Sequence, residues 1–258
     1  MLKNKEEIIT WLENNNIVNY IIHDDFSISV NESVFLRDKN LKQIPLQFNV
    51  IHGSFDCSNN QLTSLFGSPK IINGDCNFSR NKLKDLEYCP NIVRGNFLAT
   101  YNNIHSLKFF PNSIGKGIYL QNNNLIFLEN LPQKVCGHLL LVNNYLTSME
   151  GLPKNIQGTL DISYNHISTL QNTQLIEVDS IVIHHNEIRE LKEFGYFHSL
   201  VLKKLFIDAN LINLDNQQHD SVYILEDEKL KSLFNTLHLE NLLIQDLNKK
   251  NSSKIIKV

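Results

Sequence analysis

The sequence predicts a solenoid of the α/β class, in which one short unit is stacked along a curved parallel β-sheet. The convex side is expected to be mostly extended or loop backbone, with a helical cap at each end. The evidence is a spacing of 21 residues that three residue types share: prolines at Pro69, Pro90, Pro111, Pro132 and Pro153, glycines at Gly53, Gly74, Gly95, Gly137 and Gly158, and asparagines at Asn60, Asn81, Asn102, Asn123, Asn144, Asn165 and Asn186. A fixed period of this length is typical of stacked repeats, whose units contact only their neighbours.

The repeated unit is easiest to see in residues 55 to 65, which read FDCSNNQLTSL. Counted from Phe55, apolar residues stand first, third, eighth and eleventh, and an asparagine stands sixth. The same frame recurs at residues 160 to 167 and 181 to 188. Because the first three positions alternate, we expect a strand whose first and third side chains point inward. The inward pairs include Phe97/Ala99, Ile118/Leu120, Leu139/Leu141 and Ile181/Ile183.

The asparagine at the sixth position is expected to be structural. It points inward once per turn, and a buried side-chain amide needs hydrogen-bond partners. If equivalent asparagines are stacked, each side chain can bond the backbone of the neighbouring turn. The sequence therefore predicts a ladder of asparagines and not a binding site.

Residues 1 to 33 are predicted to form an N-terminal cap made of a helix and a hairpin. A helical spacing of apolar residues within residues 4 to 14 is followed by three asparagines, which end a helix. Residues 19 to 22 and 26 to 30 then flank His23-Asp24-Asp25, a pattern typical of a hairpin. The apolar residues of the predicted helix are Ile8, Trp11 and Leu12.

The repeats are assigned to residues 34 to 224. The first repeat has Lys39 where the later ones have asparagine, as terminal repeats often differ from the rest. Near the other end the period breaks, because 24 residues separate Ile181 from Leu205. We place an insertion at residues 193 to 198 to account for the difference.

The last ladder asparagine is assigned to Asn210. Residues 225 to 258 are predicted to form a C-terminal helical cap, because the leucines of residues 226 to 249 have amphipathic helical spacing, broken near His238. The alternative is a separate effector domain. Too few residues remain for a second hydrophobic core, so the cap is favoured.

The frame resembles the leucine-rich repeat, L-x-x-L-x-L-x-x-N-x-L. The stretch GSFDCSNNQLTSLFGSPKIINGDCNFSRNKLKDLEYCP is similar to a short, bacterial and bacteriophage type in which CSNNKLTSLEG-P runs recur. The preceding IHDDFSISVNESVFLRDKNLKQIP also resembles the lead-in of these proteins. The resemblance covers roughly residues 17 to 215 and implies a leucine-rich-repeat fold. It implies little about function, because a fold does not fix an activity.

Composition narrows the classes of partner and compartment. A net charge of -3 and a pI near 6.4 argue against a nucleic-acid groove, which needs a basic stripe. No apolar run is long enough to cross a bilayer, and the N-terminal residues lack the apolar core of a secretory signal. We therefore expect a cytoplasmic protein of a bacterial or host cell, with the virion as the alternative location. Secretion by a route without such a signal remains open.

The four cysteines are interpreted as buried free thiols. Cys57 and Cys76 stand at inward strand positions, and Cys89 precedes a proline where other repeats have an apolar residue. Cys136 lies at a variable loop position. None of the spacings matches a zinc pair, so we expect neither a metal nor a disulfide.

Function is expected on the outward strand positions, which would line the concave face. The second residue of each frame points outward, and nothing in the fold requires it to be apolar. In the middle of the stack it is nevertheless apolar or aromatic, and large side chains stand nearby at the fourth, fifth and seventh positions. Such a patch suggests a partner site; the alternative is that large side chains merely shield neighbouring strands. The candidate partner-binding residues are Leu98, Tyr101, Tyr119, Leu140, Val142, Tyr145, Tyr164, Val182, His184 and His185.

One group of residues resembles a chemical site. His166 stands one repeat before His184 and His185, so these side chains could approach one another across adjacent strands. A zinc or proton-relay site would also need a carboxylate, for which Asp161, Asp208 and Glu187 are candidates. No nucleophile accompanies them, so a polar rim around a binding surface is the preferred interpretation.

Three functions follow from these observations. The preferred one is a non-enzymatic module, without a cofactor, that binds a protein through the concave face. The alternative is a structural or accessory component of a phage or virus particle or another large assembly, so virion or assembly proteins are the alternative partners. An effector enzyme with a ubiquitin-ligase domain after the repeats would need a reactive cysteine near the C-terminus. The last cysteine is Cys136, inside the repeats, which argues against this third function.

Overall fold

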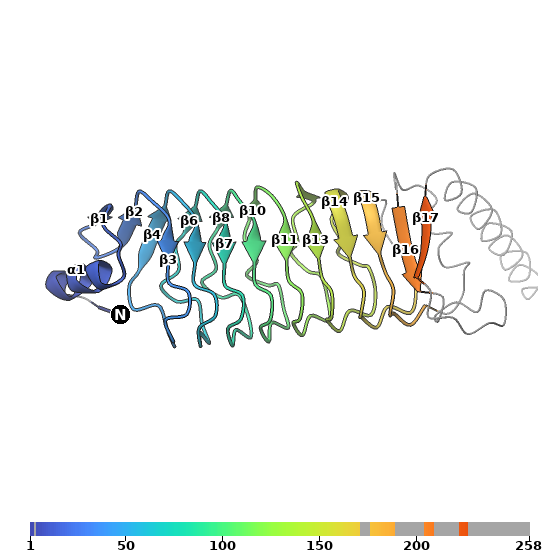
Figure 1. Ribbon diagram of the computed structural model, residues 1–258, viewed down its shortest axis with the longest axis horizontal. Helices are drawn as coiled ribbons and strands as arrows, with labels where there is room; N and C mark the ends of the chain where they lie inside the picture. The colour runs from blue at the N-terminus through green and yellow to red at the C-terminus, as the bar shows by residue number, and fades with distance from the viewer. Residues whose placement is uncertain (3, 171–175, 189–203, 209–221, 227–258) are drawn as a thin grey trace, which may run out of the picture.

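The computed structural model describes residues 1–258 except 3, 171–175, 189–203, 209–221 and 227–258. For residues 204–208 and 222–226 it describes the backbone alone. Its turns follow one another in a straight row (Figure 1), and each turn of the main body repeats after 21 residues. The protein is therefore a β-solenoid of parallel strands.

The first described elements are a helix and a hairpin, as predicted. Helix α1 spans Lys5–Asn14, and Asn4 caps it by accepting a hydrogen bond of 2.9 Å from the backbone N–H of Glu6. Ile8 and Leu12 are fully buried on one face of the helix. Strands β1 (Tyr20–Ile22) and β2 (Ile28–Val30) then pair in antiparallel fashion, which confirms the predicted hairpin.

One long sheet runs the length of the stack. From β3 to β16 its neighbouring strands are parallel, and the last, β17, is antiparallel to β16. We call its outer surface the long-sheet face; it is the face that the sequence analysis expected to be concave. The strands are β3 (Val34–Phe35), β5 (Phe55–Asp56), β7 (Cys76–Asn77), β9 (Phe97–Leu98), β11 (Ile118–Tyr119), β13 (Leu139–Leu140), β14 (Asn155–Asp161), β15 (Glu177–Val182), β16 (Lys204–Asp208) and β17 (Val222–Glu226).

A second sheet replaces part of the loop backbone expected elsewhere in each turn. It continues from β1 and β2 through four further short strands in parallel pairing. Later in the stack β12 pairs with β14, and β14 and β15 are long enough to extend along both rows of strands, so these strands all belong to the long sheet. The short strands are β4 (Phe48–Ile51), β6 (Ile71–Ile72), β8 (Ile92–Val93), β10 (Ser113–Ile114) and β12 (Lys134–Val135).

The core lies between these rows of strands. The predicted inward pairs, from Phe97/Ala99 to Ile181/Ile183, are at most 1% exposed, which confirms their orientation. A chain of edge-to-face aromatic rings runs through the early turns, with centroids 5.2 to 6.5 Å apart. The rings belong to Phe48, Phe55, Phe78, Phe97 and Phe110.

The predicted asparagine ladder is confirmed. Asn123 is typical: its Oδ1 accepts from the backbone N–H of Ile104 in the preceding turn at 3.1 Å. Its Nδ2 donates to the carbonyl oxygens of Ala99, one turn back, at 2.9 Å and of Leu120, in its own turn, at 3.1 Å. All seven ladder asparagines from Asn60 to Asn186 are buried and bonded in this way.

A second ladder, not predicted, lies directly before the strands of the long sheet. There a polar side chain accepts a hydrogen bond from the backbone N–H found 21 residues later, at 2.7 to 3.0 Å. The acceptors are Ser33, Ser54, Asp75, Asn96 and His138. These bonds bring the turns close together. A β-carbon on Gly74 would lie 2.7 Å from the backbone nitrogen of Ser54, which explains why glycine recurs at this position of the turn.

At the C-terminal end, the pairing of Ile181 with Leu205 confirms the break of 24 residues. The predicted insertion at 193–198, Asn210 and all but the first two residues of the helical cap predicted at 225–258 lie outside the described residues. Leu225 and Glu226 belong to strand β17, which corrects the predicted start of the cap. Within the described residues, no helix has the length and apolar character needed to cross a membrane.

Candidate functional site

The candidate site is centred on three side chains of the long-sheet face, which we call the central row: Leu98, Tyr119 and Leu140. They occupy the second position of β9, β11 and β13, and the strand pairing places each beside the next. All three are half-buried, and the residues on either side of each in its strand are fully buried. The central row is therefore one continuous apolar strip across three turns.

In other turns, the residue at the second position accepts a hydrogen bond from the backbone, which the residues of the central row do not. Asp56, Asn77 and Asp161 occupy the second position there, and each accepts a hydrogen bond from the backbone N–H two residues later, at 2.9 to 3.0 Å. Such short-range side-chain to backbone bonds are typical of aspartate and asparagine at turns. Leucine at this position cannot accept such a bond, so the apolar residues of the central row are not explained by the needs of the turn.

The ring of Tyr119 lies where a neighbouring residue is a glycine. The ring contacts Gly117, where an added β-carbon would be only 2.9 Å from the ring atom Cε2. Gly117 occupies the position that holds the polar acceptors of the second ladder in other turns, such as Asn96. The ladder thus lacks its side chain at the place where the tyrosine ring is seated.

The other predicted residues of the long-sheet face lie near the row but are less continuous with it. Val142 is half-buried two residues beyond Leu140, after the end of strand β13. Val182 is also half-buried, but Asp161 stands between it and Leu140 in the register. Among the predicted residues, the three of the central row are therefore the ones that lie side by side without a polar residue between them.

The predicted tyrosines lie at the edge where the strands turn, and they pair along the stack. Tyr101 is 50% exposed, and the guanidinium carbon of Arg80, one turn earlier, lies 4.4 Å from its ring centroid. The ring of Tyr145 stacks on His166, one turn later, with a centroid separation of 5.8 Å. Tyr164 stacks on His185 in the same way at 4.2 Å.

The histidines come together in part as predicted. Nδ1 of His184 lies 2.8 Å from Nδ1 of His185, and Nδ1 of His166 lies 2.7 Å from Oε1 of Glu187. Asp161 does not join them, because its carboxylate bonds the hydroxyl and the backbone N–H of Ser163. Across the described part of the chain, no group of three or more histidine, cysteine or acidic side chains could hold a metal ion.

The cysteines belong to the interior with one exception. Cys57 and Cys76 are fully buried free thiols, as predicted, and Cys89 is half-buried. Burial raises the pKa of Cys57 to about 12, with a smaller contribution from Asp56, and it raises the pKa of Cys76 and Cys89 well above the usual thiol value. Cys136 is exposed, which corrects the prediction that all four thiols are buried.

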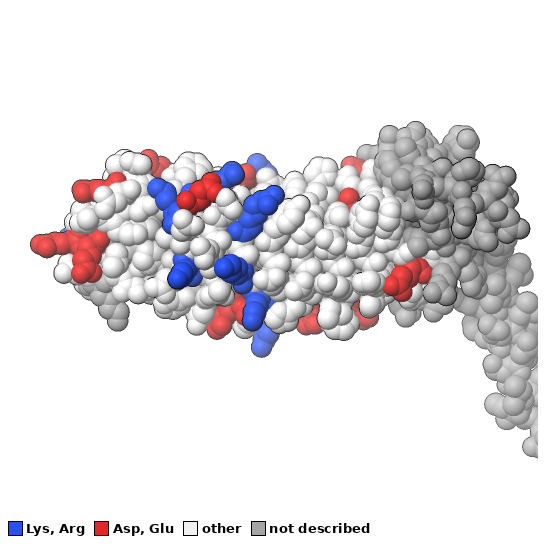
Figure 2. All heavy atoms as spheres, turned by 60° about the horizontal axis from the view of Figure 1, so that its bottom comes forward, with Lys and Arg blue, Asp and Glu red and all other residues white. Residues whose placement is uncertain are grey.

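Charge is distributed unevenly along the stack. Residues 34 to 116 carry ten basic and five acidic side chains, whereas residues 117 to 188 carry two basic and six acidic ones. Figure 2 shows the basic side chains gathered over the early turns and a mostly uncharged surface beyond them. The central row begins in the basic half of the stack and ends in the acidic half.

Several exposed aromatic residues were missed by the sequence analysis because they lie outside the strands. Phe66 and Tyr88 contact edge to face, with centroids 5.1 Å apart, and are about half exposed. Phe127 is 61% exposed. An alignment of the turns at 21 residues contains the signal, since Phe127 stands where every other turn from residue 34 to residue 190 has a polar residue: glutamine, serine, aspartate, threonine or glutamate.

No model of a known protein family matches the sequence, and no curated protein matches it.

Proposed function

We propose that the chain is a protein of the leucine-rich-repeat type that binds a protein partner, without catalysis, through the central row on its long-sheet face. The observation that carries the proposal is the replacement of the capping Asp or Asn by Leu98, Tyr119 and Leu140 in three consecutive turns. A partly exposed apolar strip that the fold does not require is typical of an interaction surface.

The surroundings of the row suit a protein interface. Tyr101, Tyr145 and Tyr164 lie about half exposed at the turn edge, and each presents a large ring with a polar hydroxyl. His184 and His185 extend this edge at the C-terminal side of the row. An apolar centre with a rim of aromatic and polar side chains is the usual anatomy of a protein–protein interface.

The partner can be sought by affinity purification of the full chain followed by mass spectrometry. The proposal expects one protein to be enriched with the parent chain. Recovery of a set of particle structural proteins in constant proportion would instead support the alternative, a component of a phage or virus particle or another large assembly.

The site itself is tested by the triple variant Leu98→Asn, Tyr119→Asn, Leu140→Asn, which introduces the residue that Asn77 provides in its own turn. Removal of central apolar anchors typically weakens a complex about thirtyfold or more. We expect a decrease in affinity of this size in a pull-down or a titration. The control carries Asn112→Ala and Lys154→Ala, two exposed residues outside the strands of the long sheet. Full binding by the triple variant together with loss in the control would contradict the proposal.

A further inference from the structure

A second departure from the repeat lies at the tenth position of the turn, in the segment that leads away from the long sheet. Four turns place a serine or aspartate there, and its side chain accepts a hydrogen bond from the backbone N–H two residues later, at 3.0 to 3.4 Å. Between the third and the fourth of these turns lies one with Phe127, which cannot accept this bond. The four capping residues are Ser64, Asp85, Ser106 and Ser148.

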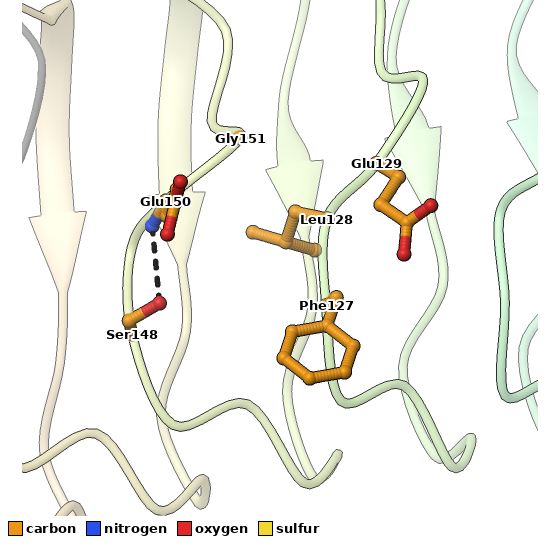
Figure 3. Close-up of a pocket in the computed structure, with 6 residues that line it drawn as sticks. All are labelled: Phe127, Leu128, Glu129, Ser148, Glu150 and Gly151. Carbon is orange, nitrogen blue, oxygen red and sulfur yellow. Dashed lines mark hydrogen bonds between the residues drawn. The ribbon is translucent and has the colours of Figure 1, made fainter.

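Phe127 gives up this bond and is not buried in exchange. Its side chain is 61% exposed, and the preceding Ile126 is 44% exposed. Beside the ring is a hollow of about 380 Å³, lined by residues 127–129 of one turn and by Ser148, Glu150 and Gly151 of the next. Figure 3 shows the ring of Phe127 and the side chain of Leu128 between these two segments.

Gly151 lines the hollow without contributing a side chain to it. At the same position, the earlier turns have Gly67, the exposed rings of Tyr88 and Phe109, and Asn130. Gly151 has a φ of 85°, and an added β-carbon would lie 2.4 Å from the carbonyl oxygen of Leu128. A side chain at residue 151 would therefore have to displace the backbone of the preceding turn, so no side chain from this position covers the hollow.

The rim of the hollow is acidic. Glu129 and Glu150 are its charged residues, and both side chains are exposed. In the part of the chain that the structure describes, the ion pairs join Arg37 to Asp38 and His166 to Glu187, so neither rim carboxylate has a basic partner there. The hollow also lies in the acidic half of the stack.

We propose that this hollow, which we call the Phe127 site, binds a segment of a partner protein that inserts a bulky apolar side chain and places a lysine or arginine against Glu129 and Glu150. The apolar floor accounts for the first requirement and the unpaired carboxylates for the second. The Phe127 site lies outside the strands that carry the central row, so its test is independent of the function proposed above.

Two synthetic peptides test the site on the full chain. One carries Leu-Phe flanked by lysines, and the other carries the same core flanked by glutamates. NMR of the isotope-labelled protein would follow the backbone amides of Leu128 and Gly151 during each titration. We expect the basic peptide to shift both signals and the acidic peptide to bind at least about tenfold more weakly.

Variants then test the apolar contact and the charge contact separately. Phe127→Ser restores the residue type of the other turns, so the fold should be kept while binding of the basic peptide falls about tenfold. Glu129→Lys combined with Glu150→Lys should reverse the preference toward the acidic peptide. Phe66→Ser removes a comparably exposed ring elsewhere and should leave binding unchanged.

Several outcomes would overturn the proposal. These are equal binding of the two peptides, no shift with either, an effect of Phe66→Ser as large as that of Phe127→Ser, or a lower melting temperature of Phe127→Ser that reveals a structural ring. Self-association in analytical ultracentrifugation that Phe127→Ser abolishes would instead assign the hollow to a second copy of the chain.

Discussion

The turns that begin at Phe55 and Cys76 and those that begin at Phe97, Ile118 and Leu139 have equivalent interiors and different outer surfaces. In both groups the first and third side chains of the strand are fully buried and a ladder asparagine bonds the preceding turn. Only the earlier group has Asp or Asn at the second position, where it caps the following backbone N–H. The later group has the central row.

This difference shows which residue positions are constrained by the stacking of the turns and which are free to vary. A substitution of an inward side chain changes its buried contacts with two neighbouring turns, so the inward strand positions hold apolar residues. An outward residue contacts solvent and can change without loss of the fold. Apolar residues at an outward position, where a polar one would make an additional hydrogen bond, therefore indicate a requirement other than stability.

A large effect on stability is expected in the interior that the two groups of turns share. Asn123→Leu leaves the N–H of Ile104 and the carbonyl of Ala99 without their side-chain partner, which should lower the free energy of unfolding by about 1 to 3 kcal/mol. The neighbouring Asn124 is exposed, so Asn124→Leu is the matched control and should change little. Chemical denaturation measures both. Equal effects of the two substitutions would show that the ladder does not stabilise the stack.

A smaller effect is expected from the buried thiol of Cys57, whose pKa is raised to about 12. As the pH rises above the usual thiol value, the unfolded chain loses this proton first, so the stability that the neutral thiol contributes at lower pH is lost between about pH 9 and 12. At pH 10 the loss should be about 1.4 kcal/mol.

Cys57→Ala is the matched variant for this effect, because Ala99 occupies the same position in a later turn. Thermal melting between pH 8 and pH 11 should show a shallower decline for Cys57→Ala than for the parent chain. In native conditions a thiol-alkylating reagent should label the exposed Cys136 and leave Cys57 and Cys76 unlabelled. Parallel pH profiles, or rapid labelling of Cys57, would contradict its burial in a well-packed interior.

The regular parts of the molecule could be predicted from the sequence because the period fixes them. Asparagine at a constant spacing needs buried partners, and alternation at Phe97 and Ala99 identifies the inward side. The second sheet was missed because pairs such as Ile71–Ile72 are too short to show strand periodicity. The second ladder was missed because Ser54 and Asp75 differ in type and share only the ability to accept a hydrogen bond.

The position of the candidate site could be predicted from the sequence, but the contacts among the side chains around it could not. The central row follows from alternation alone, because the second strand residue must point outward. The pairing of Tyr101 with Arg80 and of Tyr145 with His166 depends on how the turn edges stack, which the spacing does not specify. Phe127 was overlooked because only the hydrogen bonds of Ser64 and Ser106 show what its position does in other turns.

The most direct test of the central claim is the thermal stability of the triple variant Leu98→Asn, Tyr119→Asn, Leu140→Asn beside Leu120→Ser. Loss of cross-strand contacts in the triple variant is offset by new capping hydrogen bonds, so its free energy of unfolding should stay within about 1 kcal/mol of the parent. Leu120 is fully buried, and Leu120→Ser should cost about 3 to 5 kcal/mol. A loss in the triple variant as large as that of Leu120→Ser would show that the central row serves the fold and contradict its assignment as a binding surface.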